Sequence, residues 1–477
     1  MVKSLKILLV IPRSCNADGR YIMPMGILYV SAYTKSAGIN IFTLNLNHFV
    51  EPLEDIITKF IRDNHIDVVA TGGLSGEYLI LKPIFDVVKK QYPNIVTVLG
   101  GGIVTAEPQI AMDALKNADI GIVGEGEITW VELVRAMENN KSLSEVKGLI
   151  YRTPKGYFQT AEREEIADLN ALPFPDYEGF EYSQFLKKSP YGTGNAGELL
   201  TPASVLGSRS CPFRCTFCFH PTGKKYRVRS MDSIFEEIDY LYHHYSVNYI
   251  TLQEELFSSS KQRIFEFCSR ISSYKMNWSI QLRADVVDRE IFQTLKRSNC
   301  LYLYLGIESA DDFILRSMRK KITISQVEQS LAWADEFGLL VRSAIILGDQ
   351  RESLQSALRS LQWWKKYSHY NPNFGRNIRI DMIIPFPGSE LYRNAVLSGK
   401  IKNQVGFLQA NCPLVNLTQM SDEEYRYLLR VVQGLNCQKY HLWKDDICEL
   451  IDLRDEDDYP TIEDFQQFVL GRTRVMS

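Results

Sequence analysis

The sequence has few histidines and no excess charge of either sign. Seven His occur among 477 residues, and the formal net charge is −3. A charge this close to zero provides no basic field, so we expect no nucleic-acid partner. No apolar run reaches the roughly 18 residues that a membrane-spanning helix needs, so we expect no membrane association.

Cysteine is also sparse, and most of it is scattered along the chain. Six of the nine Cys stand alone, namely Cys15, Cys268, Cys300, Cys412, Cys437 and Cys448. Such scatter does not predict a disulfide framework, and it is typical of a reducing compartment. We therefore expect a cytoplasmic protein, long enough at about 150 residues per domain for three domains.

The other three cysteines are gathered in one short run. Cys211, Cys215 and Cys218 can ligate three irons of a [4Fe–4S] cluster, whose ligands are Cys thiolates. The run holds no fourth Cys, so one iron can stay open for a small molecule. The alternative is a structural zinc site with His220 as the fourth ligand. Zinc sites usually use two separate ligand pairs, and a second pair is missing here.

Residues 1–145 alternate short apolar runs with amphipathic stretches, a pattern that predicts an α/β fold with a doubly wound, Rossmann-like parallel sheet. The expected strands are Ile7–Ile11, Ile39–Leu44, Asp67–Thr71, Ile95–Leu99 and Ile120–Val123. The expected helices are Met25–Ser36, Leu53–Asp63, Leu79–Lys90 and Glu127–Glu138.

Glycines stand where the expected strands of this domain end. They are Gly72, Gly73, Gly101, Gly102 and Gly124, and Glu125 follows the last of them. In open α/β sheets the ligand crevice lies beyond the carboxyl ends of the strands, where glycine lets the backbone approach a ligand. The alternative is that these glycines only make turns. No G-x-G-x-x-G follows the first strand, so a dinucleotide fingerprint is absent.

Residues 146–200 predict a hairpin (Gly148–Tyr151 and Phe158–Thr160) followed by an ordered linker. A second series of strands and helices follows in residues 201–390. Its six expected strands are too few for an eightfold barrel and suit a partial (β/α)6 TIM-like barrel. They are Ala203–Gly207, Tyr249–Gln253, Trp278–Arg283, Tyr302–Gly306, Val341–Leu347 and Ile378–Ile384. Residues 391–477 predict a mainly helical C-terminal region.

Polar side chains end several barrel strands, at the same mouth as the cysteine run. Glu254 and Glu255 end the second strand, Arg283 the third, and Glu308 the fourth. A carboxylate there can accept charge-assisted bonds from an ammonium group, and an arginine can hold a carboxylate bidentately. For any single one of these groups, a surface ion pair is the alternative.

The CxxxCxxC spacing, with the aromatic Phe217 before its last Cys, resembles the radical SAM superfamily. The whole chain from about residue 5 to about residue 430 resembles the cobalamin-binding-domain radical SAM family. The segments that carry this resemblance are Met23–Tyr29, Gly100–Gly102, Gly124–Glu127, Pro173–Pro175, Gln281–Asp285, Gly306–Ser309 and Pro385–Gly388.

The resemblance implies a [4Fe–4S] cluster on the three cysteines and S-adenosylmethionine (SAM) on its open iron. Glu255, beside Glu254, then meets the SAM amino group, and Glu308 and Ser309 meet its ribose and methionine ends. Gly348 and Glu352 match the fifth-strand motif, but Asp-Gln-Arg stands where that motif usually has Pro-Gly, which leaves the local turn in doubt. An external one-electron reductant such as flavodoxin or ferredoxin is also implied.

The front domain lacks the Asp-x-His-x-x-Gly motif of cobalamin domains that supply a histidine ligand. Asp63 and His65 match its start, but Val68 replaces the glycine. The resemblance implies that the domain binds cobalamin, and the missing motif implies that it does so without a protein lower ligand. Alternatively, it is a relic that only shapes the substrate cavity.

The expected function is cobalamin-dependent methylation of an unactivated carbon in a small metabolite or natural-product intermediate. One SAM then recharges the cobalt, and a second supplies the 5′-deoxyadenosyl radical. Two alternatives stay open. The radical can serve a reaction without methyl transfer, such as deoxygenation, dehydration, cyclisation or carbon–carbon bond formation. The chain can also be a zinc-stabilised binding module without catalysis.

Overall fold

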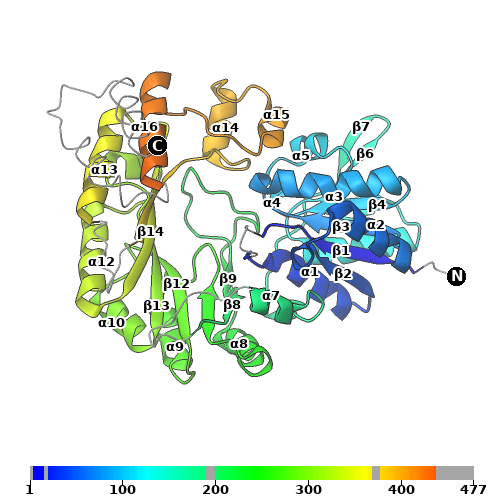
Figure 1. Cartoon of the computed structure of the whole chain (residues 1–477), viewed down its shortest axis with the longest axis horizontal. Helices are drawn as coiled ribbons and strands as arrows, with labels where there is room; N and C mark the ends of the chain where they lie inside the picture. Colours follow the sequence, from blue (N-terminus) through cyan, green and yellow to red (C-terminus); the bar gives the residue numbers. More distant parts are fainter. Residues whose placement is uncertain (1–3, 16–19, 189–198, 368–376, 437–477) are drawn as a thin grey trace, which may run out of the picture.

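The computed structural model describes residues 4–15, 20–188, 199–367 and 377–436. Two α/β units lie side by side, the first in blue and cyan and the second in green and yellow in Figure 1. No helix in these residues combines the length and the apolar character needed to cross a membrane. The predicted fold class is confirmed.

The front unit is built on one seven-stranded sheet. Its order is β2 (Ile41–Asn45), β1 (Ile7–Ile11), β3 (Val68–Gly72), β4 (Val96–Gly100), β5 (Ile120–Ile122), β6 (Leu149–Thr153) and β7 (Gly156–Gln159). The first five strands are parallel, whereas β6 and β7 run antiparallel. The predicted hairpin therefore extends the front sheet.

Helices cover both faces of this sheet, which is why β1 and β3 are apolar runs without alternation. α1 (Met25–Ser36) and α6 (Gly126–Glu138) share an apolar cluster with one face. α2 (Leu53–Asn64) and α3 (Tyr78–Gln91) pack on the other. Short helices α4 (Gly102–Ala106) and α5 (Pro108–Ala114) follow β4, and α7 (Tyr182–Lys188) leads toward the second unit.

The second unit is an open barrel of six parallel strands in the order of the chain. They are β8 (Pro202–Val205), β11 (Tyr249–Leu252), β12 (Asn277–Arg283), β13 (Cys300–Gly306), β14 (Leu340–Leu347) and β15 (Asn377–Met382). Its helices are α8 (Met231–Tyr245), α9 (Lys261–Ile271), α10 (Arg289–Arg297), α11 (Asp312–Ser317), α12 (Ile324–Phe337) and α13 (Leu354–Tyr367). In the described residues β8 and β15 do not pair with each other, as a partial barrel requires.

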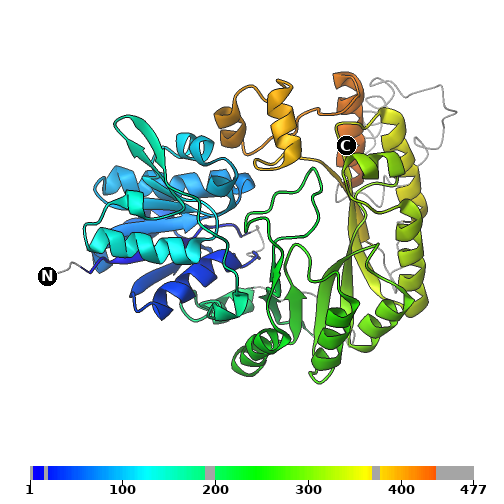
Figure 2. The same ribbon diagram turned by 180° about the vertical axis from the view of Figure 1, so that it is seen from behind.

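Beyond the barrel come α14 (Glu390–Leu397), α15 (Gln404–Gln409) and α16 (Asp422–Asn436). Figure 2 shows α14 and α15 in orange, reaching from the barrel toward the front unit. Phe407 and Leu408 of α15 share an apolar cluster with Phe85 of α3 and Met112 of α5. The helical C-terminal region thus ties the two units together. Residues 437–477 lie outside the described residues.

Candidate functional site

The three cysteines lie in a loop framed by a small antiparallel ribbon, β9 (Ser208–Arg209) and β10 (Arg227–Val228). None of the three forms a disulfide within the described residues. Ser210 takes a left-handed conformation, with φ of 65°, and turns the chain into the loop. The Arg214 guanidinium then donates to the carbonyls of Cys211 and Lys224. These contacts fix the loop without using a thiol.

Cations near the loop favour thiolate. A hydrogen bond from Cys218, aided by the charges of Lys320 and Arg283, lowers the pKa of Cys215 to about 6. Burial raises the pKa of Cys211, and the hydrogen bond with Cys215 together with burial raises the pKa of Cys218. Lys320 and Arg283 are therefore the cations near this loop that favour a thiolate at Cys215.

The donor set fits a [4Fe–4S] cluster better than a single ion. Among the described residues, no three His, Cys, Asp or Glu side chains converge as ligands of one ion. In a [4Fe–4S] cluster each thiolate binds a different iron, so the three sulfur atoms need not converge on one position. The ligands of a zinc ion, in contrast, must all reach the same atom. His220, the fourth ligand of the zinc alternative, instead turns Nδ1 to Glu255 Oε2.

Arg283 braces the cysteine loop from the third barrel strand. Its guanidinium carbon lies 3.6 Å from the centre of the Phe213 ring. Its Nε and Nη2 donate to the two carboxylate oxygens of Asp285 at 2.9 and 3.0 Å. The guanidinium predicted to hold a carboxylate of SAM thus already holds Asp285.

Glu308 faces the site with Lys320, a residue that sequence reasoning missed. Glu308 has a left-handed φ of 65°, and its Oε1 accepts from Lys320 Nζ at 2.6 Å. A Cβ on Gly306 would lie 2.6 Å from the same Nζ, so glycine makes room for this pair. Lys320 lies between Arg319 and Lys321, a basic run that resembles an exposed helix end, so sequence alone gave no signal.

Two other predicted residues anchor local structure. Ser309 is fully buried, and its Oγ accepts from the Asp311 backbone N–H at 3.1 Å. Phe217 packs against Met318 and Leu391, which ties the cysteine loop to the barrel. Neither contact tests the predicted SAM role, which stays a prediction.

The adjacent glutamates at the end of β11 have different surroundings. Glu254 Oε2 accepts from the Gly207 N–H at 2.8 Å, while its buried Oε1 finds no partner among the described residues. Burial raises the pKa of Glu254 to about 8. Glu255 is more exposed and pairs with His220. Glu255 is thus the carboxylate available at the mouth.

The turn after β14 does not need the Pro-Gly pair. Gly348 has a positive φ of 117°, and its N–H donates to Glu352 Oε2 at 2.5 Å. Glu352 and Asp349 are both fully buried. The Glu352 side chain therefore closes this turn around Asp-Gln-Arg, which removes the doubt about its geometry.

The glycines of the front unit bring two strand ends into contact. A Cβ on Gly72 would lie 2.7 Å from the Gly100 carbonyl oxygen, and one on Gly101 would lie 2.7 Å from that of Gly73. Packing alone therefore requires glycine at these two positions. Gly124 differs, because it has a φ of 86° and open space around its missing Cβ. Packing of the strand ends therefore does not account for Gly124, and its role in binding cobalamin stays a prediction.

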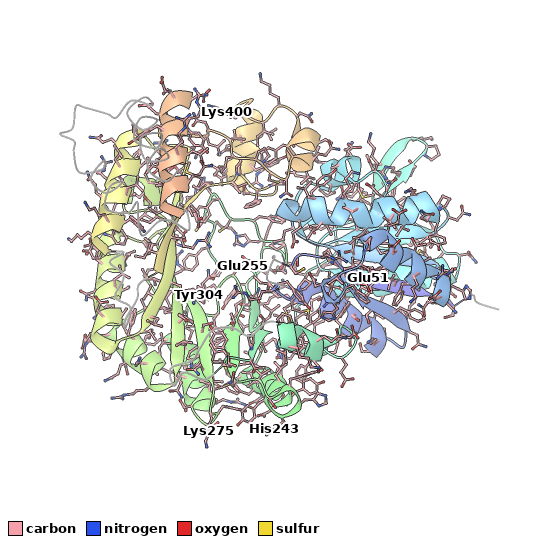
Figure 3. All side chains as sticks on the ribbon, in the orientation of Figure 1. Glu51, His243, Glu255, Lys275, Tyr304 and Lys400 are labelled. Atoms are coloured by element: carbon pink, nitrogen blue, oxygen red, sulfur yellow. The ribbon has the colours of Figure 1, made fainter. Side chains whose placement is uncertain are left out.

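The same strand ends touch the cysteine loop. A Cβ on Gly102 would lie 3.5 Å from atoms of Phe219 and Pro221, which directly follow the cysteines. In Figure 3, Glu255 lies on the side of the barrel that faces the front unit. The cysteine loop thus lies close to the strand ends of the front unit.

Glu125, predicted as a cobalamin contact, joins the two units instead of facing an open surface. Its Oε1 accepts from Arg209 Nη1 at 2.5 Å, and its Oε2 accepts from Arg227 Nη1 at 2.7 Å. Arg209 Nη2 also donates to Glu127 Oε1 at 2.5 Å. These four side chains, each less than a tenth exposed, form what we call the interdomain ion cluster.

Both histidines of the front unit lie in other environments. His48 contacts the Tyr21 hydroxyl through Nε2 and Glu181 through Nδ1, at 2.9 and 3.1 Å. His65 ends α2, ahead of β3 and therefore at the amino ends of the strands. His48 directly follows β2 at the carboxyl-end side of the sheet, but both of its ring nitrogens already face other side chains, whereas His65 lies at the opposite edge.

Comparison with known proteins divides the chain into two matched segments. Residues 205–363 match the radical SAM superfamily, and residues 17–134 match the B12 binding domain. An uncharacterized methyltransferase of Pyrococcus horikoshii is 26% identical over 442 residues, which cover 90% of this chain and 92% of the relative.

Two further proteins are similar. The anaerobic magnesium-protoporphyrin IX monomethyl ester cyclase of Cereibacter sphaeroides is 24% identical over 73% of this chain and 58% of the cyclase. The structure of the cobalamin-dependent S-adenosylmethionine radical enzyme OxsB, with aqua-cobalamin and S-adenosylmethionine bound, superposes with a TM-score of 0.70. It is 14% identical and covers 100% of this chain and 75% of that chain. The shared fold confirms the predicted fold class, a front α/β unit followed by a partial barrel.

Proposed function

We propose that this chain, a radical SAM enzyme with a B12 binding domain in front of its barrel, methylates an unactivated carbon of a small molecule. The cofactors of these matched domains are a [4Fe–4S] cluster, SAM and cobalamin. When bound, they supply a 5′-deoxyadenosyl radical to remove substrate hydrogen and a methyl group carried on cobalt.

One observation carries the proposal. A Cβ built on Gly102, two residues after β4 of the front unit, would lie 3.5 Å from Phe219 and Pro221, which follow the cysteines. The radical source and the methyl carrier would then adjoin the same substrate. Holding reactants in near-attack geometry replaces an improbable collision with a prearranged one.

Two carboxylates are our candidates for holding SAM. Glu255 is 28% exposed and Glu308 14% exposed, so both side chains reach the open mouth. Each already faces a cation or imidazole, Lys320 for Glu308 and His220 for Glu255. We propose that the SAM ammonium displaces His220 from Glu255 and that Lys320 keeps Glu308 oriented.

The remaining partners belong to the same proposal. Reductive cleavage of SAM needs one electron at a time, so we propose a small one-electron donor such as flavodoxin or ferredoxin. The free thiols of the cysteine loop favour a reducing compartment, and we propose the cytoplasm.

A product balance with methyl-labelled SAM tests the proposal. Anaerobic protein, loaded with iron, sulfide and cobalamin, is incubated with reductant and fractions of small metabolites. We expect 5′-deoxyadenosine and S-adenosylhomocysteine in equal amounts, with label in the product. Deoxyadenosine without S-adenosylhomocysteine or label would contradict methyl transfer. It would instead favour a cyclisation or deoxygenation, the class to which the similar cyclase points.

A further inference from the structure

The ring of Phe219 lies between a glycine of the barrel unit and a glycine of the front unit. A Cβ built on Gly388 would overlap Cδ2 of this ring and would lie 2.6 Å from Cε2 and 2.9 Å from Cγ. A Cβ built on Gly102 would lie 3.5 Å from Cε1. Because Cδ2 and Cε1 are opposite corners of a phenyl ring, the two glycines face opposite edges of the Phe219 side chain.

Gly388 belongs to a turn that approaches both the cysteine loop and the front unit. With a φ of 89°, it leads the chain from β15 toward α14. At the start of α14 the Leu391 N–H donates to the Thr216 carbonyl of the cysteine loop at 2.9 Å. In the same turn, Phe386 points its ring toward the front unit, where a Cβ on Gly76 would lie 3.5 Å from Cε1. Three segments that are distant in the sequence therefore meet around Phe219.

The chain neighbours of Phe219 are two residues of the proposed SAM site. Cys218, a proposed cluster ligand, precedes it, and the Cys218 N–H donates to the Cys215 carbonyl at 3.2 Å. His220 follows it and turns Nδ1 to Oε2 of Glu255, the carboxylate proposed for the SAM ammonium. Each neighbour is one peptide unit, about 3.8 Å between Cα atoms, from Phe219. A displacement of the ring that moves its backbone therefore moves both.

The other two phenylalanines of the loop have contacts within the barrel unit. Phe213 lies under the Arg283 guanidinium, whose carbon is 3.6 Å from the ring centre. Phe217 packs against Met318. Phe219, in contrast, has a residue of the front unit beside one edge of its ring. It is therefore the phenylalanine of this loop that can relate the position of the cysteines to the front unit.

From this placement we infer that Phe219 is a positioning residue. Its ring holds the cysteine loop at a fixed position against the front unit, and Cys218 and His220 are thereby placed for SAM. The inference rests on the proposed function, because it concerns the SAM site of that proposal. A misplacement of about 1 Å can cost about a hundredfold in rate, so the position of this loop affects the chemistry as well as the folding.

A double-mutant cycle on the anaerobic, cluster-loaded protein tests the inference. Gly388→Ala places a methyl group in the space of the ring, and Phe219→Ala removes the ring. Gly399→Ala is the matched control for the first change, because Gly399 has a φ of 73° but open space around its missing Cβ. It reports the cost of the backbone conformation without the contact. Phe158→Ala, on exposed β7, is the control for the loss of a ring.

The measured quantities are SAM affinity per bound cluster, by equilibrium dialysis with labelled SAM, and the EPR spectrum of the reduced cluster with and without SAM. We expect Gly388→Ala and Phe219→Ala each to weaken SAM binding by about tenfold or more, whereas both controls match the unchanged protein. Because both changes act on one ring, Gly388→Ala should add less than about threefold in the Phe219→Ala background.

Iron content and thermal midpoints separate this role from a purely structural one. A ring that only stabilises the fold would lower the midpoint or the cluster content and leave SAM affinity per cluster unchanged. Phe219→Leu, which keeps much of the bulk, provides the same comparison if Phe219→Ala does not retain its cluster.

The outcomes distinguish the inference from the proposed function. Equal SAM affinity per cluster in Phe219→Ala and Phe158→Ala, or fully additive effects of Phe219→Ala and Gly388→Ala, would overturn the inference. The methyl-label balance of the unchanged protein tests the function on the same samples. SAM affinity that depends on Phe219, in a protein that releases 5′-deoxyadenosine without methylated product, would refute methyl transfer and leave the positioning role standing.

Discussion

At the scale of single residues, buried carboxyls with incomplete hydrogen bonding distinguish this protein. Glu254 and Glu352 each have one buried oxygen that finds no partner in the described part of the chain, and so does Asp349. Such groups are costly when charged, because burial removes water that would solvate the anion. Both glutamates are therefore expected to hold a proton near neutral pH.

Glu352 makes this expectation measurable as a pH dependence of stability. Burial raises its pKa from 4.5 to about 8 in the folded protein. Between these values the folded state binds more protons than the unfolded chain, so the stability from this group falls as pH rises. Glu352→Gln cannot ionise and should flatten that decline, as measured by thermal midpoints of the anaerobic protein at several pH values. Glu423→Gln, on the exposed start of α16, is the control. A decline as steep in Glu352→Gln as in Glu423→Gln would contradict the expectation.

The cysteine loop gives the second prediction at this scale. Replacing Cys211, Cys215 and Cys218 by Ala should abolish binding of iron and sulfide, because cluster irons are held by Cys thiolates and these three are the proposed ligands. Iron and sulfide analysis after anaerobic reconstitution measures the effect. Cys15→Ala, which removes a free thiol elsewhere, should leave cluster content unchanged. Full iron content in the triple variant would remove the cluster from this loop.

At the scale of elements, close backbone contact between β3 and β4 determines where glycine stands. Gly72 and Gly100 are paired at the ends of these strands, and Gly101 lies against Gly73. A side chain at these positions would separate the strand ends. A Cβ on Gly102, the residue after Gly101, would lie 3.5 Å from Phe219, so the cysteine loop runs close to these strand ends.

Gly101→Ala tests whether these strand ends require glycine. The new Cβ would lie 2.7 Å from the Gly73 oxygen, and the φ of 85° disfavours any L side chain. We expect a loss of more than about 1 kcal/mol in the free energy of unfolding. Gly26→Ala, in α1 with open space around it, should be neutral or stabilise by up to about 1 kcal/mol. Urea unfolding of both variants measures this, and equal stabilities would show that the strand ends tolerate a side chain.

At the scale of the whole molecule, two separate contacts hold the front unit against the barrel. The interdomain ion cluster lies beside the cysteine loop, since Arg209 precedes Cys211 by two residues. The second contact is the apolar packing of α15 against α3 and α5, and α15 follows the barrel in the sequence. The space between the two domains is therefore shaped by contacts that come from three different parts of the sequence.

Glu125→Ala should loosen this arrangement. It leaves the buried Arg209 and Arg227 without one carboxylate, and breaking a buried ion pair typically costs about 3–5 kcal/mol. We expect faster amide hydrogen exchange in β9, β10 and the start of α6. The control is Glu132→Ala in α6, the helix that follows Glu125. It removes the partly exposed ion-pair partner of Arg163 and should lower the free energy of unfolding by about 1 kcal/mol or less. Equal exchange in the two variants would show that the cluster does not hold the units together.

The sequence by itself determined the fold class of both units and placed three candidate cluster ligands in one short loop. Apolar runs separated by amphipathic helices specify parallel strands with covered faces, because only that packing buries both sides of a strand such as Val68–Gly72. The three cysteines are close in the chain, so their shared loop needed no tertiary information. Strand limits shifted by one or two residues, as for Ile41–Asn45, because hydrogen bonds rather than hydrophobicity end a strand.

Only the tertiary structure decided which polar groups face the site and which hold it in place. Glu125 and Arg283 have side chains of the kind that bind ligands, yet each is already paired within the protein. Glu125 pairs with Arg209, which is distant in the sequence, and Arg283 pairs with Asp285, two residues away. Lys320 reaches Glu308 because α11 ends against the fourth strand. Alternation along one strand places Arg342 on a face, but the register between strands is what sets it beside Tyr304. Pairing between distant segments depends on packing of the whole fold, which one sequence pattern does not contain.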